Sequence, residues 1–133
     1  MKRFEVFYNT IIKSNNLINE CHFFVQSGKL KEVLTRQLNN NDLLFNEANL
    51  IASSFGIKFK NFKKVDNLED FKLKASMDIS DSGIAKTLIL SLTSVLCELV
   101  EEINEISDSV ELEIYNKLKK SLELFLEELK NFI

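Results

Sequence analysis

The single histidine of this 133-residue chain, His22, directly follows Cys21, so nucleophilic catalysis is the first chemistry that the residue types suggest. A thiolate is activated by an imidazole within hydrogen-bond reach. Neighbouring residues on a helix point about 100° apart, however, so the thiol and the ring diverge. The second cysteine, Cys97, stands among aliphatic residues without a nearby base. We therefore expect no catalytic residue, two buried free thiols of a reducing compartment, and a half-covered boundary position for His22.

Carboxylates are the other groups with chemical potential, and four of them follow one another closely: Glu98, Glu101, Glu102 and Glu105. Their oxygens suit a hard cation, with Glu20 or Glu47 as additional ligands from elsewhere in the chain. The same spacing is also typical of the solvated face of an amphipathic helix. We favour the solvated face and predict no metal site, while cation binding stays open as the alternative.

Aromatic and basic residues alternate in the segment IKFKNFKK, which spans residues 57–64 in the one basic part of the chain. Such a segment can stack on bases and hold phosphates, or press into an anionic membrane surface. The same alternation arises when a connecting segment packs Phe59 and Phe62 onto the protein while its lysines face water, and we favour this interpretation. The segment is nevertheless the candidate partner surface, and it consists of Lys58, Phe59, Lys60, Phe62, Lys63 and Lys64.

Composition narrows the function classes. The net charge is −3, so the chain as a whole has no strong signal for nucleic-acid binding. Hydrophobic residues make up 45% and charged residues 28%, which is typical of a folded soluble domain. No secretion signal is visible, because the apolar stretch after Arg3 is interrupted by Glu5, Asn9 and Lys13. We expect a cytoplasmic protein with one domain over residues 1–133.

The most apolar segment runs from Ile84 to Val100, and Lys86 is its one charged residue before Glu98. A helix of this composition is apolar on nearly every side, so we expect it to be the central helix of a bundle and to act only as core. Its uncharged stretch, residues 87–97, is much shorter than the roughly 20 apolar residues that a membrane-spanning helix needs. We therefore predict that the protein is not transmembrane.

The fold prediction is an all-α four-helix bundle. Proline is absent and glycine occurs three times, which favours long helices. Apolar residues at three- and four-residue steps predict four helices, at residues 3–26, 29–55, 82–106 and 109–132. Two very short links make antiparallel hairpins of residues 3–55 and 82–132. Residues 57–80 are long enough to travel the length of the bundle, so we predict a crossover there, with a short helix around residues 68–75.

The helix ends carry their own signals. Gly28 is expected to end the first helix in the left-handed conformation, and Gly56 to end the second in a Schellman-type cap. An oxygen from residues 80–82 is expected to cap the third helix. Asp108 and Glu111 have the three-residue offset of a capping box at the start of the fourth.

This layout, with SGKLKEVL after the first turn, LIASSFGI ending the second helix and SDSGIAKTLILSL opening the third, resembles the ferritin-like families. The resemblance is to small bacterial members similar to spore coat protein F, and it covers the whole chain in layout. A ferritin-like di-iron site needs a Glu from two helices and a Glu-x-x-His pair from each of the other two. The chain contains no Glu-x-x-His, because Glu20 lies two residues before His22 and on another face. We predict no di-iron or di-manganese centre and no cofactor.

Two function classes stay open. The one we favour is a non-catalytic helical-bundle protein with a structural or protein-interaction role. It would meet a protein partner, or associate with itself, through the crossover or the acidic outer face. The alternative is a ferritin-like bundle that binds a small ligand or a metal with degenerate ligands.

Overall fold

The computed structural model describes residues 3–62 and 79–133 of the chain. These residues form four long α-helices: α1 (Glu5–His22), α2 (Gly28–Ser54), α3 (Asp81–Ile103) and α4 (Ser109–Leu129). Two 3-10 helices add single turns, η1 (Phe59–Asn61) after α2 and η3 (Lys130–Phe132) after α4. The predicted all-α four-helix bundle is confirmed.

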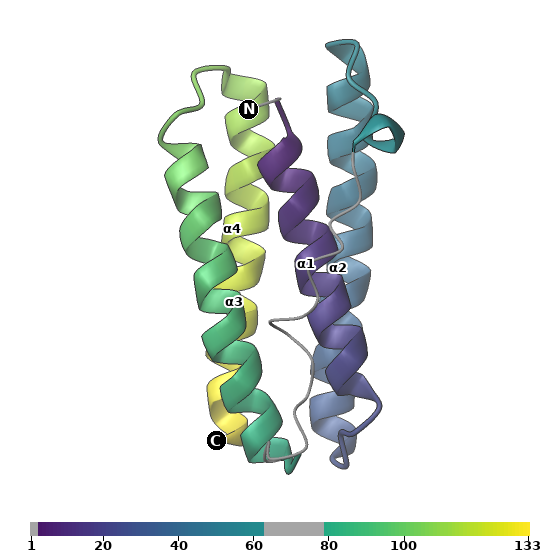
Figure 1. Cartoon of the computed structure of the whole chain (residues 1–133), viewed down its shortest axis with the longest axis vertical. Coiled ribbons are helices and arrows are strands. Elements are labelled where there is room, and N and C mark those ends of the chain that lie inside the picture. The colour runs from purple at the N-terminus through teal and green to yellow at the C-terminus, as the bar shows by residue number, and fades with distance from the viewer. Residues whose placement is uncertain (1–2, 63–78) are drawn as a thin grey trace.

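Figure 1 shows α1 and α2 as one antiparallel hairpin and α3 and α4 as another. The end of α2 and the beginning of α3 lie at opposite ends of the bundle. Most of the crossover predicted at residues 57–80 lies outside the described residues. α3 packs on α4 and α1, and α2 packs on the same two helices. The helices therefore form a square in which every neighbouring pair is antiparallel. The short helix expected around residues 68–75 lies outside the described residues.

The link between α1 and α2 differs from the prediction. α1 ends at His22 instead of residue 26, after which the amide of Val25 donates to the His22 carbonyl at 3.3 Å. Gly28 does not end a helix in the left-handed conformation. It is the first residue of α2, and Ser27 is the N-cap, whose hydroxyl accepts from the Leu30 amide. Serine satisfies an orphan amide at a helix start, so this local hydrogen bond sets the boundary.

The end of α2 follows the prediction. Gly56 has a φ of 77°, a left-handed conformation that glycine adopts without steric cost. Its amide donates to the Ser53 carbonyl, and the Ile57 amide donates to the Ala52 carbonyl, both at 3.0 Å. These two bonds constitute the Schellman motif and satisfy carbonyls that the helix leaves unpaired.

The start of α3 has two parts. Ser80 caps the helix, because its hydroxyl accepts from the Gly83 amide at 3.1 Å. Asp81 points away from its own helix and accepts hydrogen bonds from the amides of Gln26 and Ser27, both at 2.9 Å. One carboxylate thus joins the beginning of the second hairpin to the turn of the first.

Only half of the expected capping box forms at the start of α4. The Asp108 carboxylate accepts from the Glu111 amide at 2.9 Å. The Glu111 carboxylate does not return the bond, because Arg3 binds it at 3.0 and 3.2 Å through two guanidinium nitrogens. Arg3 also lies over the ring of Phe55, 4.0 Å from its centroid. Glu111 is 6% exposed, and burying a carboxylate is costly unless a cation pairs with it. The ion pair with Arg3 therefore takes the place of the reciprocal capping bond.

The core has two halves along the bundle axis. The first, which we call the aliphatic half, lies around the α1–α2 turn and the start of α3, and its buried residues are Leu17, Ile18, Cys21, Val25, Leu30, Val33, Leu34, Ile84, Leu88, Leu92, Phe125, Leu126 and Leu129. The second, the aromatic half, surrounds the other end and comprises Phe4, Phe7, Tyr8, Ile11, Ala48, Ala52, Phe59, Leu99, Ile114, Tyr115, Leu118 and Leu122.

α3 is not a central helix, contrary to the prediction. It occupies one corner of the square and buries a single face made of Gly83, Ile84, Ala85, Leu88, Leu92, Val95 and Leu99. Leu90 is 75% exposed, and Cys97 is exposed as well. A square of four helices has no interior position, so even the most apolar helix keeps one side on the outside. By length and composition α3 also passes as a membrane span, the only such helix in the described ranges, a test that core helices pass too.

Candidate functional site

The middle of the bundle contains a layer of uncharged polar side chains between the two core halves. Ser14 on α1 and Gln37 and Asn41 on α2 are almost completely buried. Asn41 donates to the Ser14 hydroxyl at 2.9 Å and to the side-chain oxygen of Asn15 at 2.8 Å. Gln37 in turn donates to Asn41 at 3.0 Å and to Ser121 of α4 at 3.1 Å. These bonds connect α1, α2 and α4, and they satisfy the layer from within.

The carboxylates lie elsewhere. Glu98 forms an ion pair with Lys13 at 3.3 Å, and Glu101 is exposed on α3. Glu102 and Glu105 line a polar cavity of about 390 Å³ near the α3–α4 turn, where the Arg3–Glu111 ion pair also lies. Within residues 3–62 and 79–133 no group of three or more His, Cys, Asp or Glu side chains is arranged to hold a metal ion.

The thiols and the imidazole do not form a nucleophilic pair. Cys21 is buried in the aliphatic half, and burial raises the pKa of its thiol to about 11, with Glu20 adding to the shift. The Nε2 atom of His22 lies 3.3 Å from the Thr35 hydroxyl, and the ring is half-buried at the edge of the bundle. Cys97 was expected to be buried, but it sits on the outer side of α3.

The described part of the basic segment packs as one of its two interpretations predicted. Phe59 is 2% exposed and belongs to the aromatic half, and the half-buried Phe62 contacts it with ring centroids 5.6 Å apart. Lys58 and Lys60 are exposed. The aromatic rings thus serve as packing, while a binding role for this segment stays a prediction. Lys63 and Lys64 lie outside the described residues.

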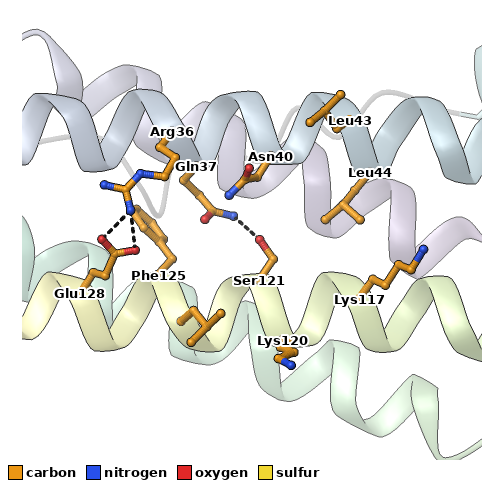
Figure 2. Close-up of a pocket in the computed structure, with 11 residues that line it drawn as sticks. Arg36, Gln37, Asn40, Leu43, Leu44, Lys117, Lys120, Ser121, Phe125 and Glu128 are labelled. Atoms are coloured by element: carbon orange, nitrogen blue, oxygen red, sulfur yellow. Dashed lines mark hydrogen bonds and ion pairs between the residues drawn. The ribbon is translucent and has the colours of Figure 1, made fainter.

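A groove lies between α2 and α4 on the surface of the bundle. It has a volume of about 540 Å³ and is shown in Figure 2. We call it the α2–α4 groove. Leu43 of α2 and Leu124 of α4 are among its lining residues and are 69% and 57% exposed. Gln37 and Ser121 of the polar layer reach its floor, where their hydrogen bond is visible in Figure 2.

Ion pairs between the two helices mark both ends of the α2–α4 groove. At one end the Arg36 guanidinium contacts both Glu128 oxygens, at 2.8 and 3.1 Å. At the other end the Lys117 ammonium lies 2.7 Å from a Glu47 oxygen, and this hydrogen bond raises the pKa of Lys117. Exposed ion pairs contribute little to stability. These two nevertheless show which residues of α2 and α4 lie at the same height along the bundle.

The sequence prediction missed this groove. Its signal is a pair of leucines that stand off the buried stripes. Leu43 falls five residues after Leu38 and two before Phe45, so it does not share the three- and four-residue spacing of the buried stripe. Leu124 is likewise off the stripe of its helix, because it directly precedes the buried Phe125. Isolated exposed leucines are common, so the signal acquires meaning only when α2 and α4 are placed side by side.

Comparison of the chain with models of protein families, with curated proteins and with solved structures gave no match. The functional interpretation therefore depends on the geometry of the molecule itself.

Proposed function

We propose that this chain is a non-catalytic helical-bundle protein with a structural or protein-interaction role, and that the α2–α4 groove is its contact surface. The observation that carries the proposal is the pair of exposed leucines, Leu43 on α2 and Leu124 on α4, that line one concave surface. Apolar anchors bordered by charged residues are typical of surfaces that another protein covers.

The arrangement of reactive groups supports a non-catalytic role. Burial raises the pKa of the Cys21 thiol and so disfavours the nucleophilic thiolate, and its neighbour His22 interacts with Thr35. The polar layer beneath the groove uses its donors internally, between Asn41, Ser14 and Gln37. The groove itself offers apolar area and paired charges, which suit recognition better than bond making.

The test is site-specific photo-crosslinking in the native cell. A photoreactive amino acid replaces Leu43, and a matched control replaces Leu90, which is similarly exposed but lies on α3. We expect protein adducts at Leu43 and few at Leu90. Mass spectrometry identifies the adduct, and the purified partner must bind the purified chain. Equal labelling at both positions, or no protein adduct at Leu43, would contradict the proposal.

The alternative function, metal binding by a degenerate ferritin-like ligand set, makes a separate prediction. It requires metal to stay with the protein after dialysis against a chelator-free buffer. We expect well under one iron or manganese ion per chain when the cells are grown with added metal, because the buried layer holds amides and hydroxyls where such a site needs carboxylates and imidazoles. Elemental analysis of the purified protein measures it, and one tightly held ion per chain would replace our proposal.

A further inference from the structure

We infer that the occupant of the α2–α4 groove is a second copy of this chain, bound across a twofold axis that runs along the groove. This inference rests on the proposed function, because it takes the groove as the contact surface. It names the partner, which the proposed function leaves open.

The antiparallel packing of α2 and α4 makes this surface complementary to itself. A twofold axis along the groove, parallel to both helices, places the partner's α2 over α4 and the partner's α4 over α2. The rotation keeps every residue at its own level along the axis. Each α2 residue therefore faces, across the interface, the same α4 residues that it already neighbours within its own chain.

The charges at the two ends match under this rotation. Within one chain, Arg36 is level with Glu128 and Lys117 is level with Glu47. Across the twofold axis, Arg36 therefore faces the partner's Glu128, and Lys117 faces the partner's Glu47. Opposite charges meet at both ends in both copies, so the contact is balanced although each chain carries a net charge of −3.

The apolar residues match as well. Leu43 and Leu124 lie between the two ion pairs, on opposite sides of the groove. The rotation brings each Leu43 next to the partner's Leu124, so that two leucine pairs form across the interface, one on each side of the axis. Each leucine is more than half exposed in the single chain, and burying exposed leucines is the main favourable contribution to association.

The first experiment measures the mass of the full chain in solution. Sedimentation velocity of the purified protein over a wide concentration range should show a monomer that converts to a dimer. Leu124→Glu should abolish the dimer, since it buries a carboxylate against Leu43 in each of the two leucine pairs. Leu90→Glu, on the exposed side of α3, should leave the dimer unchanged. Circular dichroism checks that each variant is folded.

The second experiment tests the cross-copy ion pair directly. Glu47→Lys alone places two positive charges opposite each other across the interface, and Lys117→Glu alone places two negative charges there. Each variant should dimerise at least about tenfold more weakly than the native chain, because like charges facing each other disfavour association. Mixing the two variants in equal amounts should restore the dimer, since positions 47 and 117 then carry opposite charges wherever the two chains face each other. If positions 47 and 117 paired only within each chain, mixing would restore nothing, because each chain would still carry like charges at the two positions.

The outcomes separate the inference from the proposed function. A purified chain that stays monomeric throughout, or a dimer that survives Leu124→Glu, overturns the second copy as occupant. So does the failure of the mixed variants to associate. If the photoreactive Leu43 variant still forms an adduct with a different protein, the groove keeps its role as contact surface. If it forms none and the chain is monomeric, the proposed function fails too.

Discussion

The two halves of the core are built in different ways. The aliphatic half is formed by side chains of the four helices and the α1–α2 turn. The aromatic half also needs residues that precede or follow helices, since Phe4 comes before α1 and Phe59 lies beyond the end of α2. Helical periodicity specifies all of the first half except Val25 of the turn, whereas the second half depends on segments outside the long helices whose position is set by tertiary contacts.

Phe4 illustrates this dependence. It has a φ of 65°, a left-handed conformation that is unfavourable for a bulky residue. Its ring is completely buried and lies 6.1 to 6.2 Å, between centroids, from the rings of Phe55, Phe59 and Tyr115. Aromatic packing therefore holds a backbone conformation that the local sequence does not favour.

The largest effect is expected from Phe59→Ala, which removes the ring at the centre of the aromatic half. We expect a loss of about 3–5 kcal/mol in the free energy of unfolding, because the contacts with Phe4, Tyr8 and Phe45 disappear together. Urea unfolding measures it, with the less buried Phe62→Ala as the control. A loss below about 1 kcal/mol would show that the segment after α2 is not part of the core.

Leu92→Ala tests the aliphatic half. The side chain is fully buried, so we expect a loss of about 2–5 kcal/mol. Leu90→Ala is the matched control on the same helix, and it should change the free energy by less than about 0.5 kcal/mol because Leu90 is 75% exposed. Equal effects at the two positions would mean that the outer side of α3 is covered as well as its inner side.

Alkaline pH should lower the free energy of unfolding, because the Cys21 thiol of the aliphatic half is buried in its protonated form. Burial raises the pKa of Cys21 to about 11 from an ordinary value of 9.0. Burial also raises the pKa of Tyr115 in the aromatic half well above its ordinary value of 10.0, so Cys21 is the first of the two to lose its proton. The folded state holds the protonated thiol while the unfolded chain releases its proton. The stabilisation is therefore complete below pH 9 and is lost as the pH rises towards 11.

The measurement compares urea unfolding of the native chain and of Cys21→Ala at about pH 8 and about pH 10.5. We expect the native chain to lose about 1–2 kcal/mol more than the variant between these pH values. If the native chain and the variant lose the same free energy of unfolding between the two pH values, the thiol reaches solvent in the folded state.

Asn41→Ala tests the layer that separates the two halves. The substitution leaves Ser14, Asn15 and Gln37 without their shared partner, and we expect a loss of about 1–3 kcal/mol. Replacing Gln37 and Asn41 together by leucine should cost less than Asn41→Ala, since it removes the main donors of the network together. Thermal unfolding of the variants measures both effects. An Asn41→Ala variant as stable as the native chain would show that the polar layer does not stabilise the fold.

The smallest effect is expected at the exposed lysines beside Phe59. The double change Lys58→Glu and Lys60→Glu should leave the melting temperature within a few degrees, because exposed charges contribute little to stability. Photo-crosslinking at Leu43 should also be unchanged if the groove alone makes the contact. Loss of the adduct would move the contact surface to the segment at residues 57–64.

Periodicity and capping chemistry predicted what is local. The four helices, the Schellman cap at Gly56 and the serine cap of α3 all depend on residues within one or two turns of each other. The partner of Glu111 could not be predicted in this way, because Arg3 lies 108 residues away in the sequence.

The candidate site is non-local too. Leu43 and Leu124 gain significance only from the pairing of α2 with α4, which the sequence does not encode in any short pattern. The exposure of Cys97 follows from the square arrangement, since a helix at a corner has an outer side whatever its hydrophobicity. Local patterns thus specify elements, and the packing of elements decides which of their residues are accessible.

The carboxylate of Asp81 ties the start of the second hairpin to the first. It accepts two amide hydrogen bonds from the α1–α2 turn at the point where α3 begins. Because Asp81 lies 55 and 54 residues beyond the two amides that it binds, this contact holds the hairpins together at one end of the bundle.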